Sequence, residues 1–81
     1  IQFKCNFKSE KLQSNSIRWI EAMGDYVKVV TKNKNYMVLS TMKSFLEKLP
    51  ENQFIRIHKS YIVNLKKVIN YFIIQKEEKV N

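Results

Sequence analysis

The feature that most constrains the fold of this chain of 81 residues is the alternation of apolar and polar side chains along short segments. Residues 1–8 alternate throughout, with Ile1, Phe3, Cys5 and Phe7 at the apolar positions. A period of two places successive side chains on opposite faces of a strand. We therefore predict one half-buried strand over residues 1–8, with these four side chains facing the core.

Similar patterns recur through most of the sequence. Residues 17–22 alternate, which places Ile17, Trp19 and Glu21 on one side of a strand and Ile20 on the other. Polar residues 9–16 read as a turn region, Gly24 permits a turn over 23–25, and asparagines favour a hairpin turn over 33–35. The remaining segments predicted as strands are residues 26–32, 36–40, 54–58, 61–64 and 68–74.

One segment has the spacing of a helix. Within residues 41–49, apolar side chains recur three and four positions apart, at Met42, Phe45, Leu46 and Leu49. Ser40 or Thr41 can cap its start, and Pro50 ends it. The fold class predicted from the residues alone is mainly β with one short helix over about 41–49, in a single domain.

The balance of charge indicates the kind of partner. Fifteen Lys and Arg residues against seven Asp and Glu give a formal net charge of +8, so we expect a polyanion: nucleic acid first, an anionic membrane surface second. Scattered lysines can also serve only to keep sheet edges from pairing. That explanation fits less well between Glu51 and Glu77, where no acidic residue intervenes. The cations of that stretch are Arg56, Lys59, Lys66, Lys67 and Lys76.

The sequence excludes several other classes. No apolar run is long enough to span a bilayer, and the N-terminal residues have no signal-peptide core. The single cysteine, Cys5, cannot form an internal disulfide, which fits the cytoplasm. One His, one Cys and one Asp cannot build a metal cage, and the carboxylates show no paired spacing. We predict no enzyme, no metal, no cofactor and no small-molecule substrate.

Three motifs in order carry a resemblance to a known family. They are "IRWIEAMGDYVKVVT", "LSTMKSFLEKLP" and "FIRIHKSYIVNLKKV", which together cover about residues 17–69. The chain resembles the LytTR DNA-binding domain of bacterial response regulators. The resemblance implies an elongated domain of small antiparallel sheets whose loops, rather than a recognition helix, enter successive major grooves of double-stranded DNA. It also implies binding of repeated sites by pairs of protomers, with bending of the duplex.

The same resemblance implies the site residues. One reading loop corresponds to the Gly-Asp-Tyr motif and a second to the His-x-Ser-Tyr motif. A further loop comes from a last segment that this chain, ending at Asn81, does not show; we expect residues 1–81 to be a single domain without that segment. The candidate DNA-binding residues are Gly24, Asp25, Tyr26, Lys28, Arg56, His58, Lys59, Ser60, Asn64, Lys66 and Lys67.

Within the second loop, several residues have alternative roles. Lys59 at the tip can reach a phosphate or guanine O6 or N7, or it can be merely solvated. His58 can donate to DNA or brace the loop, with neither favoured, and Ser60 can bond a phosphate or its own backbone. Because Arg56 alternates with two isoleucines, Ile55 and Ile57, we expect it to face away from the core and contact a phosphate.

The remaining candidates are closer to structural roles. Asn64 stands where a strand ends, so holding a turn is favoured over a base contact. Asp25 would be repelled by phosphate and is expected to brace the Gly24 turn, with an interaction with cytosine N4 as the minor alternative. Tyr26 is as compatible with the core as with DNA. Glu21 is expected to pair with a cation or a backbone donor, and Cys5 to be a small core residue.

The function predicted is sequence-specific binding of double-stranded DNA as the output domain of a bacterial transcriptional regulator. The upstream domain is expected to be a receiver phosphorylated by a sensor kinase, or a membrane domain, and the protein to act in the cytoplasm as a homodimer on DNA. One rival is an RNA-binding β module that stacks bases on Phe54, Tyr61 and Tyr71, although alternation would turn these aromatics inward. The other is a basic adaptor for an acidic protein or membrane surface.

Overall fold

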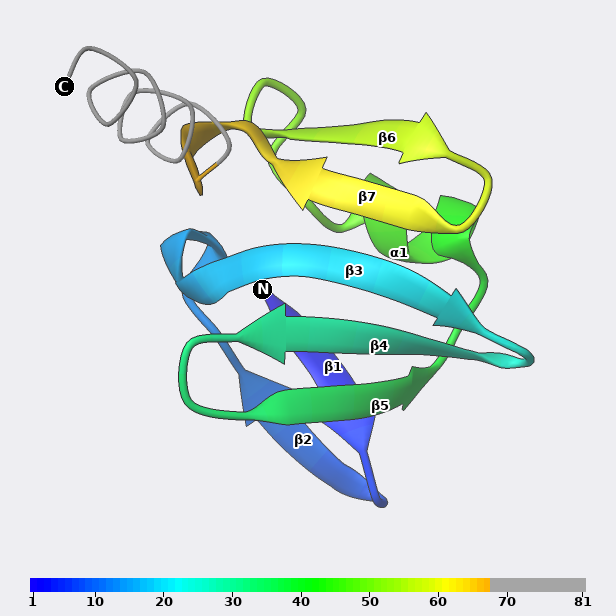
Figure 1. The fold of residues 1–81 in the computed structure, drawn as a ribbon. Helices are drawn as coiled ribbons and strands as arrows, with labels where there is room; N and C mark the ends of the chain where they lie inside the picture. Colours follow the sequence, from blue (N-terminus) through cyan, green and yellow to red (C-terminus); the bar gives the residue numbers. More distant parts are fainter. Residues whose placement is uncertain (68–81) are drawn as a thin grey trace, which may run out of the picture.

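The computed structural model describes residues 1–67 as two antiparallel sheets (Figure 1). A hairpin of β1 (Gln2–Cys5) and β2 (Lys8–Lys11) forms the smaller sheet. The larger sheet has five strands in the order β5-β4-β3-β7-β6. Its strands are β3 (Ile17–Met23), β4 (Tyr26–Thr31), β5 (Asn35–Leu39), β6 (Phe54–His58) and β7 (Tyr61–Asn64). The prediction of a mainly β fold is confirmed.

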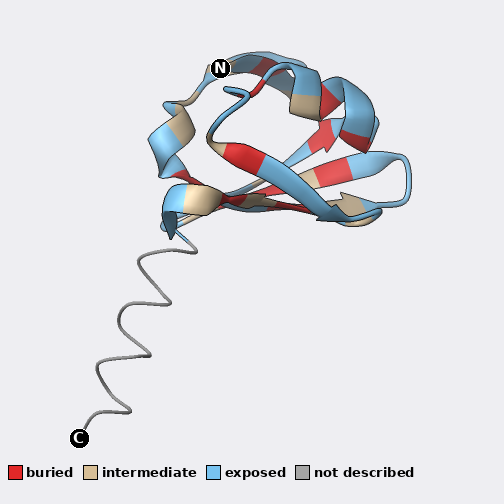
Figure 2. Ribbon diagram, turned by 90° about the horizontal axis from the view of Figure 1, so that it is seen from above, coloured by how far each residue is buried: buried red, intermediate tan, exposed pale blue. Residues whose placement is uncertain are grey.

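The helix predicted over 41–49 is confirmed as α1 (Met42–Glu47), and it packs on one face of the larger sheet. Thr41 caps it, because the Thr41 hydroxyl oxygen accepts a hydrogen bond from the Ser44 backbone N–H at 3.0 Å. Figure 2 shows that buried residues occur both in the sheet and in the layer that covers it. The core is formed by Phe3, Ile17, Ile20, Val27, Val29, Val38, Met42, Phe45, Leu49, Phe54 and Ile62.

The prediction of a single strand over residues 1–8 is wrong. The strand ends at Cys5, and Asn6 and Phe7 form a tight turn in which both have positive φ, at 52° and 64°. Two successive left-handed residues are what a two-residue hairpin turn of type I′ requires. The chain therefore reverses into β2, which occupies part of the region predicted as a turn, and Phe7 is fully exposed instead of buried. A 3-10 turn, η1 (Ser14–Ser16), follows.

The side assignment within β3 is also wrong in part. The pairing of β3 with β4 shifts register between Ile17 and Trp19, as a β-bulge does. The extra residue interrupts the alternation of faces along the strand. Ile17 and Ile20 are therefore both completely buried on the core face, while Trp19 is 36% exposed. Glu21 lies on the side of Trp19, and its carboxylate accepts a hydrogen bond from the indole Nε1–H at 2.7 Å rather than from a cation or the backbone.

The outer face of the larger sheet, turned away from α1, carries many apolar side chains. Ile55 and Ile57, expected in the core, are exposed there, and Tyr61 is 44% exposed although alternation was expected to turn it inward. Arg56 lies opposite buried Ile62 in the pairing of β6 with β7, so it is on the face of the sheet that carries the core. Because β6 is the edge strand, the Arg56 side chain is nevertheless exposed. The exposed apolar members of this outer face are Trp19, Met23, Tyr26, Met37, Leu39, Ile55, Ile57 and Tyr61.

Two further predictions concern the ends of the chain. The strand predicted over 68–74, which includes Tyr71, lies outside the described residues. Cys5 is only partly buried; it packs against the core and its thiol donates to the Met37 carbonyl at 3.4 Å. No helix within residues 1–67 is both long and apolar enough to cross a membrane.

Candidate nucleic-acid interface

Two hairpin turns lie at the same end of the larger sheet. The β3–β4 turn contains Gly24 and Asp25, and the β6–β7 turn contains Lys59 and Ser60. Strands β3 and β7 pair directly, and the Ala22 backbone N–H donates to the Ser60 carbonyl at 2.9 Å, next to both turns. Both turns are on the right in Figure 1. The fold therefore brings together two candidate loops that are more than thirty residues apart in the sequence.

The β3–β4 turn depends on the backbone freedom of Gly24. Gly24 has φ of +62°, and a Cβ placed on it would meet no atom within 4 Å. The requirement for glycine is therefore conformational rather than steric. Asp25 is exposed beside it, and Tyr26 begins β4 on the outer face, 45% exposed rather than in the core. Lys28 is half-buried opposite Glu21 on the same face.

The β6–β7 turn is braced from within by two side chains. Arg56 Nη2 donates to the Lys59 carbonyl at 2.7 Å, and His58 Nδ1 accepts from the Ser60 backbone N–H at 3.1 Å. The bracing role, one of the two alternatives for His58, is confirmed. Because Nδ1 accepts, a neutral His58 ring carries its proton on Nε2, which makes Nε2–H the donor left for a partner. Lys59 is exposed at the tip of a turn that its neighbours hold in shape.

Asn64 has no place in a DNA-contacting surface. Its side chain is completely buried, Nδ2 donates to the Ile17 carbonyl at 2.8 Å, and Oδ1 accepts from the Lys66 backbone N–H at 3.0 Å. A side chain with no exposure cannot reach a base, so its inclusion among the binding residues was wrong. Its favoured structural role, holding the turn after the strand, is confirmed.

The cationic candidates do not form one patch. Lys66 and Lys67 follow the C-terminal end of β7, whereas the β6–β7 turn precedes the N-terminal end of the same strand. Both lysines are exposed. The five-stranded sheet therefore separates them from Lys59 by the length of β7. Of the predicted residues, the structure brings together Gly24, Asp25, Tyr26, Lys28, Arg56, His58, Lys59 and Ser60.

One exposed element near this end was not predicted. The β1–β2 turn carries Phe7 beside Tyr26 and Leu39, which line the same hollow. The signal in the sequence is Asn6, a residue that tolerates left-handed geometry, but it stands inside an unbroken alternation and was read as a strand position. Within residues 1–67, no group of three or more His, Cys, Asp or Glu residues could hold a metal ion.

A small, basic, mainly β domain that presents braced turns at one end of a sheet has the general form of a nucleic-acid-binding module. The family comparison makes the class specific: residues 8–78 match the LytTr DNA-binding domain model, so the chain belongs to the LytTr DNA-binding domain family.

Individual relatives agree with this membership. The chain is 35% identical over 54 residues to the transcriptional regulatory protein YpdB of Escherichia coli O6:H1. That match spans 67% of the chain but only 22% of the relative. The fold is similar to that of the LytTr DNA-binding domain of a methyl-accepting/DNA response regulator from Bacillus cereus, with a TM-score of 0.68 and 23% identity. This likeness covers 82% of the chain and 61% of the solved structure.

Proposed function

We propose that this domain binds specific sequences of double-stranded DNA as the output domain of a bacterial transcriptional response regulator. Its two reading elements are the β3–β4 turn and the β6–β7 turn, which enter a major groove from one end of the sheet. It is a binding module without a catalytic role. Family membership supports DNA binding, and the joint placement of the two turns supports the mode of reading.

The observation that carries this proposal is the internal bracing of the β6–β7 turn. Arg56 and His58 each fix one backbone group of the turn, so Lys59 is presented on a preorganised support. A turn already ordered before binding loses less conformational entropy on contact with DNA. Two polar side chains thus hold the shape of one exposed turn. A fixed shape is what a turn needs if it must fit a groove of DNA.

Charge chemistry assigns roles to the exposed side chains. Lys59 neutralises a phosphate or donates to guanine O6 or N7 at the tip of the turn. His58 offers Nε2–H to an acceptor on a base edge or a phosphate, since its Nδ1 is occupied. Asp25, exposed in the neighbouring turn, faces either a base donor such as cytosine N4 or solvent.

The wider setting also belongs to this proposal. A receiver or membrane domain upstream would bring two protomers together on repeated sites, in the receiver case after phosphorylation by a sensor kinase. Joining two domains raises the effective concentration of the second for its half-site. The domain then acts in the cytoplasm, where the chromosome is.

The test is selection of bound duplexes from a random pool by the protein of residues 1–81, followed by binding titrations at several salt concentrations. We expect Lys59→Ala to weaken binding of the selected duplex and to lower the slope of log K against log salt by about one, as loss of one phosphate contact does.

The matched control is Lys32→Ala, which removes an exposed lysine from the β4–β5 turn at the opposite end of the sheet. At about 0.3 M salt, where long-range attraction is screened, it should bind as the unsubstituted protein does. Failure of the pool to yield any preferred duplex, or equal effects of the two substitutions, would contradict the proposal.

One observation favours a second candidate function, RNA binding. Trp19, Tyr26 and Tyr61 are partly exposed on the outer face of the larger sheet, where unpaired bases could stack on them. Competition between the selected duplex and a single-stranded RNA of the same length decides between the two. Tighter binding of the RNA would replace the DNA proposal.

A further inference from the structure

Phe7 is held in a position that a phenylalanine ordinarily avoids. It is the second residue of the β1–β2 turn, with φ of 64°, and its side chain is fully exposed. Left-handed backbone geometry disfavours a residue with a Cβ, and an exposed aromatic ring gains nothing from burial. Glycine would fit this position better on both counts. Strain retained at an exposed tip points to a function of the side chain itself.

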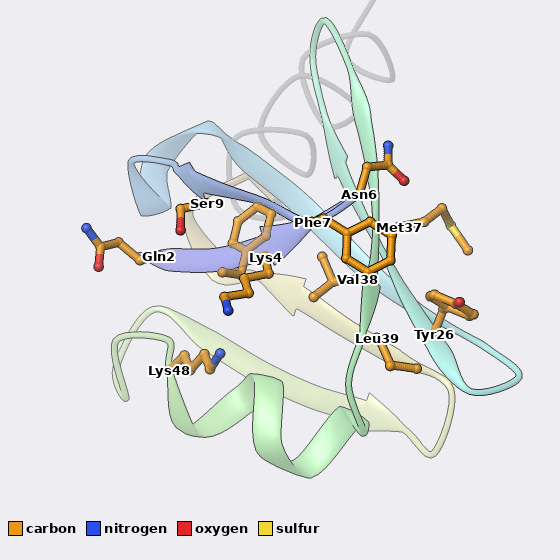
Figure 3. Close-up of a pocket in the computed structure, with 11 residues that line it drawn as sticks. Gln2, Lys4, Asn6, Phe7, Ser9, Tyr26, Met37, Val38, Leu39 and Lys48 are labelled. Carbon is orange, nitrogen blue, oxygen red and sulfur yellow. The ribbon is translucent and has the colours of Figure 1, made fainter.

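The surroundings of Phe7 suit a polyanion with apolar bases. The hollow beside it is lined on the sheet side by Tyr26, Met37 and Leu39, and its charged members are Lys4 and Lys48. None of the described residues that line the hollow is a carboxylate. Figure 3 shows the Phe7 ring beside Val38 and Met37, at the edge of the sheet formed by β5. An acidic protein surface would satisfy the lysines, but the protruding ring also fits between stacked bases.

The position of the tip relative to the two proposed reading turns is informative. Adjacent strands lie about 4.8 Å apart, so the β3–β4 and β6–β7 turns are about 10 Å from each other across the sheet. Phe7 lines the same hollow as Tyr26, which begins β4 directly after the β3–β4 turn, so the tip lies on the side of that turn away from the β6–β7 turn. A major groove about 12 Å wide accommodates the two turns, and the next feature along the duplex is the minor groove.

We propose, on the basis of the function proposed above, that Phe7 is an apolar wedge that enters the minor groove beside the major-groove contacts and kinks the duplex. Insertion of an apolar side chain between two base pairs unstacks them and bends the DNA. Lys4 and Lys48 then lie beside the phosphates that flank the opened step. The wedge adds a third contact element to the domain, on the sheet that packs behind β5.

The test is Phe7→Gly, which creates an Asn-Gly turn and relieves the backbone while removing the ring. Urea unfolding of the protein of residues 1–81 should show a midpoint at or above that of the unsubstituted protein. On the duplex selected from the random pool, we expect about 10-fold weaker binding and loss of the bend, measured by energy transfer between dyes at the two DNA ends. The matched control is Ile55→Ala, which removes an exposed apolar side chain from the outer face away from the turns; it should leave affinity and bend unchanged.

Each outcome bears on the proposal. Unchanged affinity and bend in Phe7→Gly would overturn the wedge and favour an acidic protein as the partner of this tip. The wedge would equally be overturned if the unsubstituted protein left the duplex straight and Phe7→Gly only weakened binding. No preference of the unsubstituted protein for any duplex would instead overturn the DNA-binding proposal itself, before Phe7 enters the question. The wedge is supported when affinity and bend fall together while stability does not.

Discussion

At the scale of single residues, a buried polar side chain can matter to the fold as much as an apolar core residue does. Asn64 is buried among apolar side chains, and it satisfies both a strand carbonyl and a backbone N–H beyond β7. A buried amide contributes to stability only while its partners remain in place, and its removal leaves them without hydrogen bonds. The role of Asn64 is therefore to join the start of β3 to the end of β7.

We expect Asn64→Ala to lower the free energy of unfolding by about 1–3 kcal/mol, because it leaves the buried Ile17 carbonyl without a donor. Urea unfolding followed by circular dichroism measures the change. Asn35→Ala, at an exposed position of β5, is the control and should change stability by less than about 0.5 kcal/mol. Equal changes in the free energy of unfolding for the two substitutions would show that the hydrogen bonds of the buried amide do not stabilise the fold.

Residue by residue, the sequence predicted the face of a side chain correctly only where the backbone follows a regular strand. Phe3 was assigned to the apolar face of the first strand and is buried. Ile17 was placed on the side of Trp19, opposite Ile20, because a bulge inserts one residue without any mark in the pattern. Phe7 was assigned to the core because a turn of two left-handed residues can sit inside a perfect alternation. Periodicity describes a straight strand and contains no information on where the backbone departs from it.

At the scale of elements, the helix and the turns at Gly24 and Lys59 were easier to predict than the edges of the sheet. Helix α1 has its cap, its apolar spacing and a following proline within eleven residues, so local signals suffice. Strand β6 is different: Ile55 and Ile57 read as a core face, but the side on which they lie depends on the pairing with β7 and on a second register shift between Arg56 and His58. Such pairing is a property of two segments together and is absent from either alone.

Because α1 is only six residues long, its N-cap should contribute visibly to stability. We expect Thr41→Ala to destabilise the protein by about 1 kcal/mol, since it removes the acceptor of the Ser44 N–H. Thr41→Ser keeps the hydroxyl and should be close to neutral. Thermal unfolding of the two variants measures the difference, and a destabilisation shared by Ser and Ala would point to the lost methyl group instead of the cap.

In the candidate site, too, features with local sequence signals were predicted and features that depend on strand pairing were not. The motifs around Gly24 and His58 predicted which turns are exposed, but the brace between Arg56 and the Lys59 carbonyl could not be anticipated, because it depends on the bulge that positions the guanidinium. Arg56 was predicted as a phosphate contact on the assumption of regular alternation. The structure gives its side chain a partner inside the turn itself.

We therefore expect Arg56 to act by positioning the β6–β7 turn. Arg56→Lys keeps the charge but not the planar fork, and it should weaken binding of the selected duplex about as much as Arg56→Met does. The salt slope should stay at the unsubstituted value in Arg56→Lys, while amide exchange at Ser60 becomes faster in both variants. Full recovery of affinity by lysine would instead identify Arg56 as a simple phosphate contact.

At the scale of the whole molecule, the formal charge of +8 acts apart from any single contact. A net positive potential draws DNA towards the domain from a distance and speeds association, and dissolved salt screens it over about 10 Å at 0.1 M. We expect lysines far from the two proposed reading turns to contribute to this long-range attraction without touching the duplex. Lys32 and Lys34, exposed in the β4–β5 turn at the opposite end of the sheet from Lys59, are suited to separate the two effects.

The double variant Lys32→Glu with Lys34→Glu lowers the net charge by four while leaving both reading turns intact. We expect stopped-flow association with the selected duplex to slow several-fold at about 0.02 M salt and to approach the unsubstituted rate at about 0.3 M, where charges this far apart are screened. Dissociation should change little, because no contact with DNA is lost. Lys59→Ala, in contrast, should speed dissociation at both salt concentrations. A double variant that dissociates faster, or whose association stays slow at high salt, would show that the β4–β5 turn itself contacts DNA and that the domain reads the duplex from both ends of its sheet.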